Sequence, residues 1–145
     1  NDPDNIILIG SPSWDQDVHL PAKDPITIDQ NLMYTMHFYA ATHEKWLRDR
    51  TDEALKSGLP IFVSESAGME ASGDGKMNYQ SWQEYISWME ERGISWVVWS
   101  VSDKDETCSI LKKSAHSEGN WKAEDLKESG QKTREYLRFY NKGKD

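Results

Sequence analysis

The segment Pro60-Ile61-Phe62-Val63-Ser64-Glu65 decides how the rest of the chain is interpreted, because it is a nearly unbroken apolar run that ends on a carboxylate. Short runs rich in β-branched and aromatic residues are typical of strands that are covered on both faces, as in a parallel sheet. A carboxylate is rarely placed where a buried strand reaches the sheet end unless it is paired or used. The segment therefore predicts a buried strand that presents Glu65 at its carboxyl end.

Three further runs of the same kind predict strands at residues 5–10, 33–40 and 95–101. Between and after them, apolar residues at helical spacing predict helices over 42–57, over 78–92 and from about residue 129. Glycine follows the first two helices, at Gly58 and Gly93, where it favours helix termination. Strands that alternate with helices indicate βα units and a parallel sheet.

Polar side chains follow each predicted strand, as in Trp14-Asp15-Gln16-Asp17 and Ser102-Asp103-Lys104-Asp105-Glu106. Functional groups at the carboxyl ends of parallel strands are typical of a (β/α)₈ barrel. An open doubly wound sheet has the same polarity, but no glycine-rich phosphate loop follows any of these runs. A complete barrel needs about 250 residues. The pattern alone therefore leaves open half of a barrel or a small four-stranded α/β interaction domain.

Composition excludes several classes of protein. The 145 residues carry a net charge of −8, which disfavours binding to a nucleic-acid backbone. No apolar run approaches the roughly 20 residues that span a bilayer, and the single Cys108 excludes an internal disulfide. Seven tryptophans are many for this length; at least half should fill the core, and the others suit the apolar faces of sugar rings.

His37 and Tyr39 lie two residues apart, so they point to the same face of their predicted strand. Such a pair is able to orient a neighbouring carboxylate and hold its charge; the alternative is a hydrogen-bonded core histidine beside a half-buried tyrosine. Asp15, Asp17, Asp103 and Asp105 do not match the spacing of a calcium loop, so we expect no metal and no cofactor. We expect His43 and His116 at the surface.

Several longer segments are less generic. They are Ile9-Gly10-Ser11-Pro12-Ser13-Trp14-Asp15-Gln16-Asp17-Val18, Met33–Ala40, Ile61–Glu65, Ala71-Ser72-Gly73-Asp74-Gly75, Gly93–Thr107 and Gly119-Asn120-Trp121. In this order they resemble glycoside hydrolase family 5, in its bacterial endo-β-1,4-glucanase (cellulase) branch. The resemblance covers nearly the whole chain. It departs at Ser66-Ala67, where the family usually has Trp-Gly, and at Val98, where it usually has Asn.

The resemblance implies that residues 1–145 are the C-terminal half, strands five to eight, of a (β/α)₈ TIM barrel. It implies that Glu65 is the catalytic nucleophile, with His37 and Tyr39 beside it. It also implies glucan-binding roles for Trp14, Ala71, Trp99, Lys104 and Glu106. The acid/base Glu of the family follows an Asn on strand four, which has no counterpart in these residues.

We therefore expect a retaining hydrolase that cuts internal bonds of cellulose or a related β-glucan, is secreted, and needs no cofactor. The isolated chain is expected to be nearly inactive, because it lacks the acid/base Glu and exposes the edges of strands five and eight. The N-terminal half of the barrel, or another copy of the chain, is expected to cover those edges. Two alternatives remain open at this point. The machinery acts on mannan, xyloglucan or mixed-linkage glucan, or the chain is a non-catalytic β-glucan-binding half-barrel.

Overall fold

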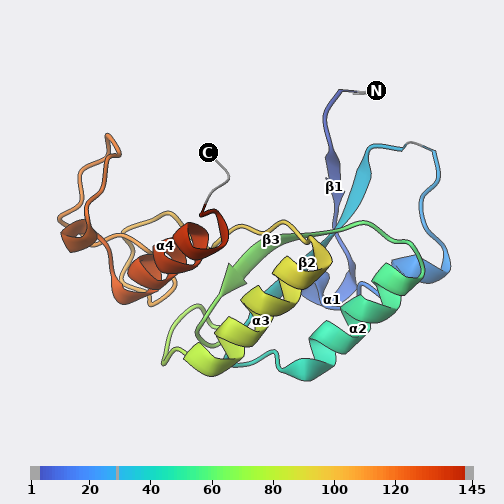
Figure 1. The fold of residues 1–145 in the computed structure, drawn as a ribbon, viewed down its shortest axis with the longest axis horizontal. Coiled ribbons are helices and arrows are strands. Elements are labelled where there is room, and N and C mark those ends of the chain that lie inside the picture. Colours follow the sequence, from blue (N-terminus) through green and yellow to red (C-terminus); the bar gives the residue numbers. More distant parts are fainter. Residues whose placement is uncertain (1–3, 29, 143–145) are drawn as a thin grey trace.

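Three of the four apolar runs form one parallel sheet in the computed structural model, which describes residues 4–28 and 30–142. The strands are β1 (Ile7–Ile9), β2 (Leu32–Tyr39) and β3 (Ile61–Ala67), and they lie side by side in the order β1-β2-β3 (Figure 1). The end residues of the predicted domain, 1 and 145, lie outside the described part of the chain.

The predicted helices are present with small shifts at their ends. They are α2 (Lys45–Lys56), α3 (Tyr79–Arg92) and α4 (Glu128–Tyr140). The side chain of Asn78 accepts a hydrogen bond of 3.0 Å from the Ser81 N–H and caps the start of α3. Gly93 ends α3 with a φ of 65°, a left-handed conformation that glycine adopts without a Cβ clash. The remaining pieces are one short turn, α1 (Pro12–Asp15), and two 3-10 turns at Pro21–Lys23 and Ala123–Asp125.

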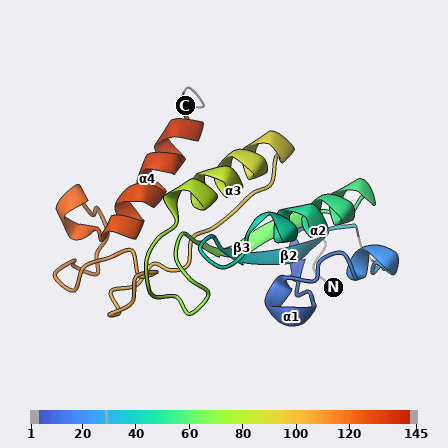
Figure 2. The same cartoon turned by 90° about the horizontal axis from the view of Figure 1, so that it is seen from below.

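The main core lies between the sheet and two helices, because α2 and α3 cover the same side of it (Figure 2). Phe38 of β2 stacks on Tyr85 of α3 with 3.9 Å between ring centroids. Met36 and Phe38 belong to this core, and successive strand residues point to opposite faces. His37 and Tyr39 consequently point to the face of the sheet that α2 and α3 leave open.

Helix α3 approaches the end of β3 closely, and this approach requires a glycine. A Cβ added to Gly68 would lie 2.2 Å from the Trp82 ring, a distance that no side chain tolerates. Trp82 is fully buried and meets Tyr136 of α4 edge to face, at 5.3 Å between ring centroids. Gly68 therefore allows the indole that joins β3, α3 and α4 to reach its place.

The prediction of a regular fourth strand over 95–101 is wrong. The segment forms a single isolated parallel bridge to β3, between Val63 and Trp96. A further hydrogen bond joins the Trp99 N–H to Ser66 O at 2.9 Å. The backbone then turns away, because the Ser100 N–H donates to the Cys108 carbonyl. Beside β3, Val97 and Trp99 are each 44% exposed, so the apolar run is covered on one side only within the described part of the chain.

Candidate active site

A β-bulge at Ser64 decides where Glu65 points. Met36 pairs with Val63 and His37 pairs with Glu65, so β3 holds one extra residue between these two pairs. If β3 paired regularly, with Ser64 opposite His37, Glu65 would pair with Phe38 and point into the core under α2 and α3. The bulge instead brings Glu65 to the same face as His37. The sequence prediction had placed Glu65 at the strand end, whereas it lies two residues before the end of β3.

Five of the eight predicted site residues line one pocket of about 580 Å³. These five are Trp14, His37, Tyr39, Glu65 and Ala71. They come from strands β2 and β3 and from the segments that follow β1 and β3, namely α1 and the loop after β3. All of these lie at the carboxyl end of the parallel sheet. Asp15, Gln16, Thr42 and His43 complete the lining.

Tyr39 and Glu65 form the central contact of this pocket. The Tyr39 hydroxyl donates a hydrogen bond of 2.5 Å to Glu65 Oε1. Burial raises the pKa of Tyr39 well above its ordinary value, and the Glu65 carboxylate raises it further by accepting the bond and by its charge. The phenol therefore stays protonated and serves as a fixed donor to one oxygen of Glu65.

His37 lies on the other side of that carboxylate. Its Nδ1 is 3.9 Å from Glu65 Oε2, too long for a direct hydrogen bond. Its Nε2 lies 2.8 Å from Ser64 Oγ and 3.2 Å from Asp15 Oδ2. The two oxygens of Glu65 thus have different surroundings, one bound to a phenol and the other open.

The prediction that His43 lies at the surface is wrong, since this residue is only 4% exposed. The tight turn after β2 buries it, and its Nδ1 accepts a hydrogen bond of 2.8 Å from the Tyr39 N–H. Burial lowers the pKa of His43 because the charged ring would lose its hydration. Periodicity does not reveal such a turn, so only the fold brings His43 to the pocket. His116 is exposed, as predicted.

Trp14 and Ala71 lie at the rim of the pocket. The Trp14 side chain is 84% exposed, so its ring face is available to a ligand. The backbone N–H of Ala71 donates to Thr42 Oγ1 at 2.9 Å, which ties the loop after β3 to the turn after β2. Asp15 is a pocket residue to which sequence reasoning gave no role, although its position in the polar segment that follows the predicted strand 5–10 pointed to the site.

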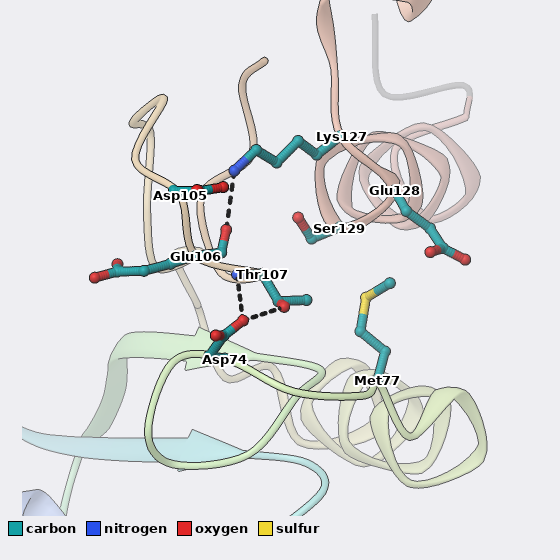
Figure 3. Close-up of a pocket in the computed structure, with 8 residues that line it drawn as sticks. All are labelled: Asp74, Met77, Asp105, Glu106, Thr107, Lys127, Glu128 and Ser129. Atoms are coloured by element: carbon teal, nitrogen blue, oxygen red, sulfur yellow. Dashed lines mark hydrogen bonds between the residues drawn. The ribbon is translucent and has the colours of Figure 1, made fainter. Parts of the chain in front are cut away.

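Trp99, Lys104 and Glu106 do not line this pocket. The backbone of Trp99 is bound beside β3 through Ser66, one residue after Glu65. Glu106 lines a second pocket of about 530 Å³, between the 103–107 loop and the start of α4 (Figure 3). Its carboxylate points away from Met77 and Glu128 in that view, and its charge contributes to the raised pKa of Tyr39. Glu106 therefore makes only a minor contribution to the raised pKa of Tyr39 and does not line the first pocket.

The described residues contain neither a metal-binding cluster nor a membrane-spanning helix. In 4–28 and 30–142, His, Cys, Asp and Glu side chains form no cluster of three or more able to hold a metal ion. Over the same ranges, none of the helices combines the length and apolar character needed to cross a membrane.

Comparison with known sequences gives a family match. Residues 1–105 match the model of the family described as cellulase (glycosyl hydrolase family 5). Endoglucanase A of Evansella cellulosilytica is 44% identical over 138 residues, which are 95% of this chain and 28% of that protein. The chain thus spans less than a third of the length of this curated relative.

Comparison with solved structures agrees. Cellulase Cel5C_n superposes with a TM-score of 0.86 at 44% identity, over 94% of this chain and 42% of that one. The catalytic domain of Thermobifida fusca endoglucanase Cel5A, solved in complex with cellotetraose, gives 0.85 at 34% identity, over 94% of this chain and 47% of that one. These neighbours are (β/α)₈ barrels, which confirms the predicted fold class: an α/β piece of such a barrel.

Proposed function

The chain belongs to glycosyl hydrolase family 5, and from this premise we propose that it is the C-terminal half of the catalytic barrel of a retaining endo-β-1,4-glucanase. In this proposal β1, β2, β3 and the 95–99 segment are barrel strands five to eight, and residues 1–145 form one half-domain. Glu65 is the nucleophile. The observation that carries the proposal is the contact set of Glu65, with Tyr39 on one carboxylate oxygen and an open pocket at the other.

The mechanism follows from that asymmetry. Glu65 Oε2 attacks the anomeric carbon while the Tyr39 hydroxyl holds the charge on Oε1. A second carboxyl group, about 5–5.5 Å away in retaining enzymes, protonates the leaving oxygen and then activates the water that releases the sugar. The N-terminal half of the barrel supplies that acid/base group. Every step is proton transfer or nucleophilic substitution, so the reaction needs no cofactor.

The proposed substrate is a β-1,4-glucan chain. The Thermobifida fusca neighbour was solved with cellotetraose, which supports a glucan in the equivalent groove. Trp14 offers an exposed indole at the pocket rim for the apolar face of a sugar ring. We assign Ala71, Trp99, Lys104 and Glu106 to further sugar contacts, with Trp99 on the opposite side of Glu65 from Trp14. A polymer of this kind cannot enter a cell, so the site of action is extracellular.

The test replaces Glu65 by Gln in a barrel assembled from this chain and the N-terminal half of a family 5 relative. We expect turnover of soluble cellulose to fall by roughly three orders of magnitude or more, as when one member of a catalytic group is removed. Binding of cello-oligosaccharides, measured by calorimetry, should stay nearly unchanged because the amide has the same shape.

The matched control is Glu70→Gln, which neutralises an exposed carboxylate of the loop after β3 and should leave turnover intact. Turnover retained by Glu65→Gln would refute the role of Glu65. Tight oligosaccharide binding without hydrolysis by the unaltered barrel would favour the non-catalytic alternative. Reducing-sugar release from mannan, xyloglucan and mixed-linkage glucan, set against cellulose, measures the substrate preference.

A further inference from the structure

Asp15 reaches the pocket through an unusual backbone turn. Ser13, Trp14 and Asp15 have φ values of 57°, 53° and 63°, so three consecutive non-glycine residues are left-handed. This conformation is disfavoured for residues that carry a Cβ, and such strain clusters at functional sites. This conformation directs the Trp14 side chain to solvent and the Asp15 side chain toward His37. The Asp15 side chain is 15% exposed there.

Asp15 resolves an ambiguity at His37. Nε2 of the ring contacts both Ser64 Oγ, at 2.8 Å, and Asp15 Oδ2, at 3.2 Å. A hydroxyl either donates or accepts, so Ser64 alone would allow the ring proton on either nitrogen. An ionised carboxylate only accepts. Asp15 Oδ1 accepts from the Ser11 N–H, while Oδ2 faces Nε2, and a neutral ring satisfies this second contact by carrying its proton on Nε2.

We propose that Asp15 is a positioning residue for the hydrolysis described above: it fixes His37 in the Nε2–H form and keeps a donor away from the attacking oxygen of Glu65. In that form Nδ1 faces Glu65 Oε2 without a proton. In the absence of Asp15, Ser64 is able to donate to Nε2, and the ring proton moves to Nδ1. An Nδ1–H would direct its positive end at Glu65 Oε2 from 3.9 Å and draw electron density from the oxygen that attacks the sugar. This inference rests on the proposed role of Glu65.

The first test is spectroscopic and does not require activity. ¹⁵N-histidine NMR at a pH where the ring is neutral distinguishes the protonated ring nitrogen from the bare one. The unaltered protein should show His37 protonated on Nε2. In Asp15→Ala, at least half of the molecules should carry the ring proton on Nδ1 instead. Asp15→Asn, whose amide oxygen still accepts, should restore the Nε2–H form. Asp17→Ala is the matched control, because Asp17 lies in the same segment but binds Ser13 and Arg50.

The second test is kinetic, in the barrel assembled with an N-terminal half. Asp15→Ala should lower kcat about tenfold with KM unchanged, while Asp15→Asn should stay within about threefold of the unaltered enzyme. An Nε2–H signature that survives in Asp15→Ala, or a raised KM with unchanged kcat, would overturn the assignment. If Asp15→Ala does not fold, Asp15→Leu gives the same two readouts. An unaltered barrel without turnover would reject the proposed function, and the NMR result would still decide the tautomer.

Discussion

Tyr39 shows how a single residue contributes to the site, because its hydroxyl is both buried and bound to a carboxylate. The bond to Glu65 Oε1 measures 2.5 Å, and the same carboxylate helps to raise the Tyr39 pKa. A raised pKa means that the folded protein favours the protonated phenol. Tyr39 therefore remains a donor at every pH up to and beyond the ordinary range of tyrosine ionisation, near 10.

At the residue scale, Tyr39→Phe should lower kcat about ten- to a hundredfold. The variant loses a hydrogen bond to a charged group, worth about 1.5–3 kcal/mol. Steady-state kinetics of the assembled barrel measure this loss. Tyr79→Phe is the matched control, since Tyr79 also donates to a carboxylate, that of Glu128, on the outside of α3. Equal kcat values for Tyr39→Phe and the unaltered enzyme would contradict the role given to the Tyr39 hydroxyl.

Polar contacts hold the 103–107 loop, which carries Lys104 and Glu106. Asp74 accepts hydrogen bonds from Thr107, at 2.6 Å from the hydroxyl and 3.2 Å from the backbone N–H (Figure 3). On the other side, Lys127 donates to the Glu106 carbonyl at 3.0 Å. The loop is thus held between the segment after β3 and the residue before α4.

At the element scale, the Asp74 contact should depend on pH. The Thr107 hydrogen bonds lower the pKa of Asp74 below its ordinary value of 3.8. A depressed pKa in the folded state means that the stabilisation is complete above the unfolded value and is lost as pH falls through the folded one. The melting temperature of the unaltered protein should therefore fall more steeply below about pH 4 than that of Asp74→Asn.

Thermal melts between pH 2 and pH 7 check this expectation, with Asp103→Asn in the same loop as the control. The difference should be small, because Asp74 is exposed to solvent and its contacts are screened. Parallel melting curves for Asp74→Asn and the unaltered protein over the whole range would show that the Thr107 contacts do not stabilise the fold.

At the scale of the whole molecule, the sheet has two incompletely covered edges. Strand β1 pairs with β2 on one side only within the described residues, and Leu8 is 42% exposed. At the opposite edge Val97, which is hydrogen-bonded to Val63 of β3, is 44% exposed. Parallel sheets are normally covered on both faces, and bare apolar edges promote association. These edges are the surfaces where we propose that the N-terminal half, or a second copy of the chain, attaches.

Leu8→Lys should weaken this assembly, because it places a charge at the edge where a neighbouring strand would pair. We expect the activity recovered on adding the N-terminal half to fall at least tenfold, and size-exclusion chromatography to show less of the joined species. Ile28→Lys is the control, since Ile28 is 85% exposed and lies outside the strands. Full activity of the unaltered chain alone, as a monomer, would rule out the need for a partner.

Local patterns in the sequence determined the architecture and the residue types of the site. The apolar runs at 5–10, 33–40 and 60–65 gave three parallel strands, since a covered strand needs a short continuous apolar segment. Helical spacing located α2, α3 and α4. The run at 95–101 does not form the predicted strand, because apolar content does not show whether a neighbouring strand is present to pair with it. These features depend on side chains close together in the chain.

Only the tertiary structure decided in which direction the side chains of the site point. The extra residue at Ser64 turns Glu65 from the core to the pocket, and the left-handed turn brings Asp15 to His37. Strict alternation along β3 would have placed Glu65 beneath the helices. Bulges, strained turns and the burial of His43 are stable only when contacts from distant segments outweigh the local preference. A sequence pattern records the local preference alone, so it identifies the catalytic candidates but not the directions in which they point.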